Sequence, residues 1–389
     1  MRRPRLLALL LLGAAVATGF YVAAPYARAA SLVVRAADLG GRVEAFANDH
    51  ARTVARQPPH AVPTRYGDVP AQLYLPEGGS RRTVILIPGI HSMGIQEPRL
   101  TALAADLAAT GVTVMALALP DLQQYRITPQ STDVIEDAVT WTAGQSDLAR
   151  DGRVGIVGVS FAGGLSIAAA GRPAVRDKIA FILSFGGHGD LRRVLRYLTT
   201  GDAPRVEGLQ VHPPHDYGAA VVLYGLADSG IVPADQVAAL REGVYTFLHA
   251  SQLTLVDMDR AMATFAKARQ MADAMPEPSR TYMTYVNDRA VSQLGQVLVP
   301  LLDTFRADDP ALSPALAALP AAPVYLLHGD GDTVIPTAES ALLGEHLRRQ
   351  GATVHVLLSG LITHAEVDKS AAAAETWKLI RFWTSVLEN

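Results

Sequence analysis

The sequence has 389 residues, of which 49% are hydrophobic and 18% charged, a composition typical of a globular protein with a large packed core. A formal net charge of −3, with no long run of Lys or Arg, argues against nucleic acid as a partner. Because the sequence contains no cysteine, disulfides, thiolate metal sites and cysteine nucleophiles are excluded.

The first thirty residues predict export. The basic sequence MRRPR is followed by 19 uncharged residues, 6–24, a run close to the roughly 20 that span a bilayer. We predict that residues 1–30 form a membrane anchor, with the three arginines of MRRPR on the cytoplasmic side and the rest of the chain facing the extracytoplasmic side. Two alternatives remain. Residues 27–29, Ala-Arg-Ala, could be a signal-peptidase site that releases a secreted or periplasmic protein, or the stretch could be a buried helix.

The next segment is predicted to connect this anchor to the main domain. Apolar residues recur at i, i+4 and i+7 within residues 31–56, which favours a helix. The sequence QPPHAVP, residues 57–63, is rich in proline and predicts a break. We therefore expect residues 31–63 to form a helical stalk with a linker, and the main domain to begin near Thr64.

The main domain alternates strand-like and helix-like segments. Short apolar runs ending in Gly or Pro are typical of strands covered on both faces, and they occur at residues 83–87, 112–119, 153–159, 179–185 and 324–327. Between them, residues 131–144 have one apolar helical face and an acidic first turn. This alternation predicts an α/β protein with a mostly parallel central sheet and helices on both faces.

One connection is far longer than a usual strand-to-helix loop. Roughly 130 residues separate the last two predicted strands, which indicates an inserted helical cap over residues 191–318 within a core formed by residues 64–190 and 319–389. The cap contains most of the methionines. Two stripes, one of Met258, Met262 and Phe265 and one of Met271 and Met275, are expected to pack the core of the cap; the alternative is an adaptable apolar pocket for substrate.

The sequence GIVGVSFAGG, residues 155–164, places Ser160 between a predicted strand and a predicted helix. A strand that turns directly into a helix strains the residue at the turn and requires small residues two positions away, here Gly158 and Ala162. An alcohol at such a turn becomes a nucleophile only with a base and with donors for the resulting oxyanion. The motif resembles the nucleophile elbow of the α/β-hydrolase family, Gly-x-Ser-x-Gly, except that Ala162 replaces the second glycine.

The resemblance implies an α/β-hydrolase fold and a triad in the order serine, acid, histidine. The family often carries its acid in the pattern His-Gly-x-x-Asp-x-x-x-Pro, which HGDGDTVIP, residues 328–336, matches with Asp332 as the acid. Asp330 and Asp190 remain alternatives for this role. The base is expected in a loop after one more helix and strand, where His364 lies.

The resemblance also implies an oxyanion hole made of backbone amides. In the family this hole is formed by the loop after an early strand and by the residue that follows the nucleophile. These positions are Ile90, in the sequence PGI, and Phe161. The chemistry requires no cofactor, and the sequence has no metal-ligand spacing, phosphate loop or dinucleotide fingerprint.

The sequence therefore predicts a serine hydrolase that cleaves an ester or thioester bond through an acyl-enzyme on Ser160, with His364 as base and Asp332 as acid. The expected substrate is a small-molecule ester with an apolar acyl or alcohol part. Two other functions remain open: a serine peptidase or amidase of the same fold, and a catalytically inactive binding protein tethered to the membrane. The sequence carries no signal for the oligomeric state.

Overall fold

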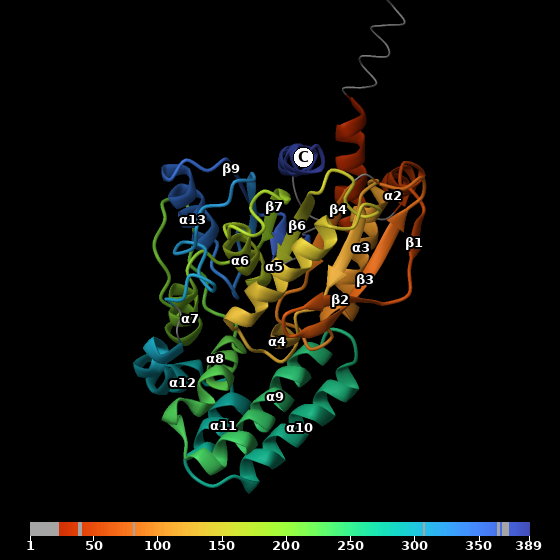
Figure 1. Ribbon diagram of the computed structural model, residues 1–389. Helices are drawn as coiled ribbons and strands as arrows, with labels where there is room; N and C mark the ends of the chain where they lie inside the picture. Colours follow the sequence, from red (N-terminus) through yellow and green to blue (C-terminus); the bar gives the residue numbers. More distant parts are fainter. Residues whose placement is uncertain (1–22, 38–40, 81, 306–307, 364–365, 368–372) are drawn as a thin grey trace, which may run out of the picture.

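A nine-stranded sheet forms the centre of the protein (Figure 1). The computed structural model describes residues 23–37, 41–80, 82–305, 308–363, 366–367 and 373–389. The strand order is β1-β3-β5-β4-β6-β7-β8-β9, with β2 paired to β3. The strands are β1 (Val54–Arg56), β2 (His60–Thr64), β3 (Gly67–Pro76), β4 (Thr83–Ile87), β5 (Thr113–Leu117), β6 (Val154–Val159), β7 (Ile179–Phe185), β8 (Val324–Gly329) and β9 (Val354–Ser359).

Six neighbouring strands of this sheet, from β5 to β9, run parallel to one another. Only the edge formed by β1, β2 and β3 is antiparallel. A separate antiparallel pair, β10 (Ile362–Thr363) and β11 (Glu366–Val367), follows β9. All five strands predicted from apolar runs are present, and β4 and β7 match the predicted bounds.

Helices cover both faces of the sheet, which explains why its strands are apolar throughout (Figure 1). Alternate residues of β4 belong to different clusters. Val84 and Leu86 share one with the helix over residues 23–36, α3 (Pro98–Ala109) and α14 (Ala373–Leu387). Ile85 and Ile87 share the other with α5 (Pro129–Ala143) and α6 (Phe161–Ala170). This is the predicted α/β-hydrolase fold. The helices of the core are α2 (Gly41–Asp49), α3 (Pro98–Ala109), α4 (Pro120–Gln123), α5 (Pro129–Ala143), α6 (Phe161–Ala170), α13 (Ala338–Arg349) and α14 (Ala373–Leu387), with the short η1 (Gly94–Gln96) before α3.

The long connection between β7 and β8 is helical, as predicted. Its apolar residues belong to the same cluster as one face of the sheet, so it packs on the core. It contains α7 (Leu191–Thr200), α8 (Gly218–Leu226), η2 (Ala227–Ile231), η3 (Ala234–Gln236), α9 (Val237–Leu253), α10 (Met258–Ala274), α11 (Ser279–Asn287), α12 (Val291–Leu298) and η4 (Val299–Phe305).

The expectation for the first stripe is wrong for two of its three residues, whereas Met275 of the second stripe is buried. Phe265 is buried, but Met258 and Met262 are 56% and 58% exposed. The buried face of α10, which packs on α9, is formed by Phe265 and three alanines spaced at helical intervals. The small alanines allow the two helices to approach closely, and the two methionines lie off this face.

The segment before the sheet differs from the predicted stalk and linker. A single helix over residues 31–56 is wrong: one helix covers residues 23–36, α2 is separate, and β1 follows it. The proline-rich stretch contains β2, which pairs with β3, so the sheet begins before Thr64. Proline is tolerated here because β2 lies at the antiparallel edge, where a missing N–H costs no central ladder bond.

The helix over residues 23–36 is fixed to the core by polar contacts. The Arg35 guanidinium donates to the Asp106 carboxylate at 2.7 Å and to its backbone oxygen at 2.9 Å, and Ser31 Oγ donates to Ala47 O at 2.7 Å. Almost all of the apolar stretch predicted as an anchor lies in residues 1–22, outside the described residues. Within the described part of the chain, no helix combines the length and apolar character needed to cross a bilayer.

Candidate active site

Ser160 occupies the turn between β6 and α6, with φ 55° and ψ −133°. A non-glycine residue with positive φ costs about 1–3 kcal/mol and persists only where its surroundings fix it. The Ser160 N–H donates to Phe185 O at 2.7 Å, and its carbonyl oxygen accepts from Gly163 N at 2.8 Å. Both backbone groups of the strained residue are thus held in place.

The small residues around Ser160 are required by packing. A Cβ at Gly158 would lie 2.5 Å from Ala162 O and 2.7 Å from Ser166 Oγ, so no side chain fits there. Ala162, which replaces the second glycine of the motif, is fully buried. Ser160 itself is 6% exposed, and its Oγ forms no hydrogen bond with a described residue.

Two backbone amides are available beside this hydroxyl. Phe161 is the first residue of α6, where an N–H has no partner within its own helix. Ile90 lies in the loop after β4, and Gly89 brings this loop against the serine: a Cβ at Gly89 would lie 2.8 Å from Ser160 Cβ and 3.5 Å from its Oγ. A helix N-terminus and an adjacent loop amide are the donors that an oxyanion hole requires.

Gly89→Ala tests this close approach. The added methyl group would also lie 3.1 Å from Val159 O, so the loop must move and carry the Ile90 amide with it. We expect kcat for ester hydrolysis to fall by about 10²–10³, the effect of losing one oxyanion donor. Gly331→Ala is the matched control, because a Cβ there meets nothing within 4 Å. Wild-type kcat in Gly89→Ala would contradict the assigned loop geometry.

Asp332 is buried and held by hydrogen bonds after β8. Its Oδ1 accepts from Val334 N at 2.8 Å and from Ile335 N at 3.0 Å, and its Oδ2 lies 3.2 Å from His328 Nε2. Its negative charge, together with burial as the larger cause, raises the pKa of Tyr197 and of Tyr217. The carboxylate is therefore oriented by its own loop and close to two residues of the long connection.

His328 organises the loop and is not available as a base. Its Nε2 donates to Ile335 O at 2.9 Å, and its Nδ1 is 2.7 Å from Ser340 Oγ. The ring is fully buried. His328, the first residue of the HGDGDTVIP motif, thus fixes the turn that positions Asp332.

Ser160 and Asp332 follow the carboxyl ends of β6 and β8, with β7 between them. Two hydrogen bonds of 2.7 Å hold the carboxyl ends of β6, β7 and β8 side by side: Ser160 N donates to Phe185 O, and Gly186 N donates to Leu327 O. Because neighbouring strands are about 4.8 Å apart, the carboxyl ends of β6 and β8 are about 10 Å apart across the sheet.

The predicted base, His364, lies outside the described residues, as does residue 365. Its role therefore stays a prediction. The strand that precedes it, β10, ends at Thr363 and contacts β8, the strand that leads to Asp332.

Asp190 and Asp330, the two alternative acids, differ from Asp332 in their contacts and exposure. Asp190 is the N-cap of α7: its carboxylate accepts from Arg193 N at 3.2 Å and lies 3.1 Å from the Arg193 guanidinium. Asp330 is exposed in the turn before Asp332. The structure therefore favours Asp332 over both.

Sequence reasoning missed one side chain that holds this site together. Gln252, at the end of α9, binds the loop that carries Ile90. Its Oε1 accepts from Ser92 N at 2.9 Å and from Ser92 Oγ at 2.8 Å, and its Nε2 donates to Ile90 O at 3.4 Å. The same Oε1 accepts from Tyr125 Oη at 2.8 Å. A cap residue thus fixes the loop that carries Ile90, the residue predicted to supply an oxyanion amide. The sequence held no local signal for this contact.

Gln252→Leu is expected to lower kcat by about 10- to 100-fold, because a displaced loop misplaces the Ile90 donor. KM should change less, since the oxyanion forms only along the reaction. The matched control is Gln236→Leu, which removes a second cap glutamine whose bonds, to Glu277 O and Ser279 Oγ, stay within the cap. Equal losses of kcat in both variants would mean that Gln252 acts only through the stability of the cap.

His91, in the same loop, is a neutral hydrogen-bond acceptor. Burial lowers the pKa of His91 to about 4, and its Nδ1 accepts from Met93 N at 3.2 Å. Ser92 Oγ also lies 3.3 Å from His249 Nδ1 of the cap. The side chains of this loop therefore stabilise its conformation. In the described part of the chain, no group of three or more His, Asp and Glu side chains is placed to hold a metal ion.

Comparisons with known proteins found similarity to solved structures and to nothing else. No protein-family model and no curated protein sequence matches the chain. An esterase from the archaeon Pyrobaculum calidifontis has 15% identity and a TM-score of 0.47, over 93% of this chain and 90% of that one. Carboxyl esterase 2 from the fungus Tuber melanosporum has 12% identity and a TM-score of 0.46, over 86% of each chain. An acylaminoacyl peptidase has 12% identity and a TM-score of 0.47, over 90% of this chain and 44% of that one.

The class of the protein follows from its own strand order and from the turn at Ser160. These features define an α/β-hydrolase fold with a nucleophile-elbow geometry.

Proposed function

We propose that this protein is a serine hydrolase that cleaves the ester or thioester bond of a small molecule through an acyl-enzyme on Ser160. The observation that carries the proposal is the strained turn at Ser160, which is buried beside two backbone amides and pressed against Gly89. A positive φ at a serine costs free energy that a purely structural turn avoids by using glycine.

In the proposed mechanism, Ser160 Oγ attacks the carbonyl carbon while His364 accepts its proton. The carbonyl oxygen becomes an oxyanion that accepts hydrogen bonds from the amides of Ile90 and Phe161. Asp332 stabilises the imidazolium of His364. The intermediate collapses when His364 returns the proton to the leaving alcohol or thiol, and Ser160 is left acylated. His364 then deprotonates a water molecule that hydrolyses the acyl-enzyme and releases the acid.

An apolar substrate is supported by the aromatic residues next to the Ile90 loop. Tyr125, which binds Gln252, has edge-to-face contacts with Tyr245 at 5.5 Å and with Tyr224 at 6.4 Å between ring centroids. The latter two come from the cap. Aromatic walls with a few polar groups are common in pockets that bind small apolar ligands.

The test uses the full chain purified in mild detergent. We expect turnover of p-nitrophenyl esters and labelling by an aryl fluorophosphonate, with the label on the peptide that contains Ser160. Faster turnover of peptide anilides than of esters would indicate a peptidase or amidase instead. No turnover and no label across both panels would overturn the proposal in favour of a binding protein.

We also propose that the protein acts outside the cytoplasm, attached through residues 6–24. Support comes from the sequence, in which arginines precede an apolar stretch of nearly bilayer length. Extraction of the native protein from membranes by detergent, but not by high salt or alkaline carbonate, is the expected result. Recovery in the soluble fraction would contradict this attachment.

A further inference from the structure

Tyr125 is a second side chain that the structure connects to the Ile90 loop. It follows the short helix α4 in the core, whereas Gln252 comes from the cap. The Tyr125 Oη donates to Gln252 Oε1 at 2.8 Å, and Gln252 Nε2 donates to Ile90 O at 3.4 Å. A single side-chain amide therefore lies between the Tyr125 hydroxyl and the residue predicted to supply an oxyanion amide.

The backbone of Tyr125 is strained. Its φ is 57°, and among the described non-glycine residues only Ser160 and Arg289 also have a positive φ. The Tyr125 N–H donates to Leu122 O at 3.2 Å, which closes the turn. A turn without another role would take glycine at such a position and avoid the strain. The strain therefore indicates that the side chain of Tyr125 is needed.

The cap holds the phenol ring of Tyr125 in one orientation. Tyr245 of α9 and Tyr224 of α8 contact it edge to face, with ring centroids 5.5 Å and 6.4 Å away. Tyr125 is 2% exposed. Burial is the main cause that raises the pKa of Tyr125, so its hydroxyl stays protonated and remains a hydrogen-bond donor.

The Tyr125 hydroxyl completes a set of donors around one oxygen atom. Gln252 Oε1 also accepts from Ser92 N at 2.9 Å and from Ser92 Oγ at 2.8 Å. With three donors on Oε1, the amide can only turn its Nε2, which is itself a donor, toward the Ile90 carbonyl. These donors also polarise the amide and strengthen the bond that Nε2 donates. Without the Tyr125 hydroxyl, the amide is freer to rotate away from Ile90.

We propose that Tyr125 is a positioning residue for the reaction at Ser160, because its hydroxyl fixes the Gln252 amide that holds the Ile90 loop. The inference rests on the proposed function, in which the Ile90 amide binds the oxyanion. In this role Tyr125 acts through Gln252 and does not contact the reacting atoms. Its effect should appear in kcat, which reports the transition state, and much less in KM.

Tyr125→Phe removes the hydroxyl and keeps the ring contacts with Tyr224 and Tyr245. We expect kcat for p-nitrophenyl esters to fall about tenfold, with KM within about twofold of wild type. The amide proton of Ser92 should exchange with deuterium about fivefold faster, since its acceptor, Gln252 Oε1, is no longer held by Tyr125. Mass spectrometry of the peptide that contains Ser92 measures this rate in the full chain.

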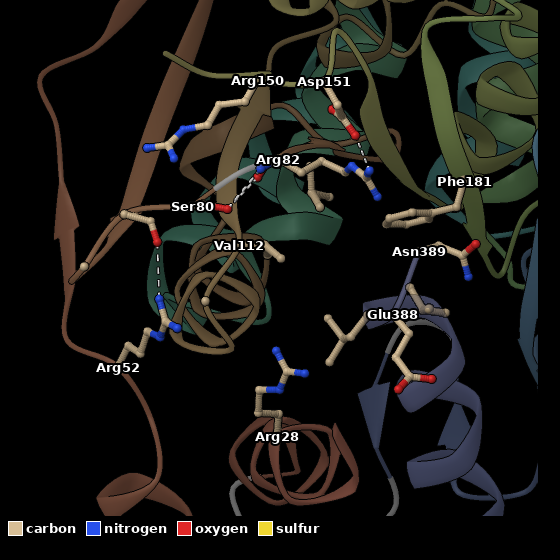
Figure 2. A pocket seen from close by; sticks show the side chains of 16 residues that line it. Arg28, Arg52, Ser80, Arg82, Val112, Arg150, Asp151, Phe181, Glu388 and Asn389 are labelled. Atoms are coloured by element: carbon tan, nitrogen blue, oxygen red, sulfur yellow. Dashed lines mark hydrogen bonds and ion pairs between the residues drawn. The ribbon is translucent and has the colours of Figure 1, made fainter. Parts of the chain in front are cut away.

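Tyr325→Phe is the matched control, because it removes the hydroxyl of another buried tyrosine at the end of the sheet opposite the candidate site. The Tyr325 Oη donates to Ser385 O at 3.0 Å. Its ring contacts Phe181, with centroids 6.3 Å apart. Phe181 lines a cavity of about 960 Å³ together with Arg82, which immediately precedes β4 (Figure 2). Both kcat and the exchange rate of Ser92 should equal the wild-type values in Tyr325→Phe.

The double variant Tyr125→Phe, Gln252→Leu tests whether the two residues act through one path. Without the amide the hydroxyl has nothing to orient, so kcat should equal that of Gln252→Leu alone. Multiplied losses of kcat would overturn the proposal, because Tyr125 would then act independently of Gln252. A wild-type exchange rate at Ser92 in Tyr125→Phe would overturn it as well. Absence of turnover in wild type would count against the proposed function instead, and the exchange rate would still decide whether Tyr125 positions the loop.

Discussion

Replacing Ser160 with alanine is expected to lower kcat/KM for ester hydrolysis by about 10⁴–10⁶ and to abolish labelling by the fluorophosphonate. The loss is this large because no other group can form the acyl-enzyme. Stability should be unchanged or slightly improved, since Ser160 Oγ has no hydrogen bond to a described residue and the backbone bonds to Phe185 and Gly163 remain. Initial rates, labelling and thermal unfolding of purified wild type and variant provide the measurement.

Ser166→Ala is the matched control for this variant. Ser166 lies on the same helix, α6, is fully buried, and donates to Ala162 O at 2.7 Å. Its removal should affect stability by about 1 kcal/mol and leave labelling intact. Residual turnover above about 1% of wild type in Ser160→Ala would refute the assigned nucleophile.

Replacing Asp332 with asparagine is expected to have the second largest effect, a decrease in kcat of about 10³–10⁴. The amide oxygen of asparagine can still accept from Val334 N and Ile335 N, so the loop should keep its shape. The negative charge that stabilises the imidazolium is lost. The pKa of the base in the free enzyme should therefore fall, and the acidic limb of the pH profile of kcat/KM should move to lower pH.

The shift of the acidic limb distinguishes a catalytic acid from a residue that only supports the loop. A purely structural defect lowers kcat/KM at every pH and leaves the acidic limb of the pH profile where it was. Asp190→Asn is the control. Asparagine is an equally good N-cap, so α7 should persist and kcat should stay near the wild-type value. A larger loss in Asp190→Asn than in Asp332→Asn would transfer the role of the acid to Asp190.

The central strands could be predicted because a parallel strand covered on both faces must be apolar along its whole length. Thr83–Ile87 and Ile179–Phe185 match for this reason. The edge strand His60–Thr64 was missed because Pro63 and the two prolines before the strand read as a break, although an edge strand tolerates proline. The N-cap at Asp190 had a readable signal, an aspartate just before an amphipathic helix.

The candidate site could be predicted only where one short segment determines its geometry. The turn at Ser160 is such a case, because its strain is local and its small neighbours are adjacent in sequence. The contact of Gln252 with Ser92 joins residues 160 positions apart and depends on how the cap folds back over the core. No periodicity or motif reports such a contact, so the link between cap and oxyanion loop required the structure.

Because the N-terminal helix over residues 23–36 packs on the core, cleavage after Ala29 must occur before the chain has folded. Ala29 is fully buried within the helix over residues 23–36, and Tyr26, one turn earlier, stacks on Trp377 of α14 at 5.7 Å. A peptidase binds its substrate as an extended strand, so it reaches residues 27–29 only while the emerging chain is still unfolded. Once α14, at the far end of the chain, has packed against this helix, the bond after Ala29 is sheltered from hydrolysis.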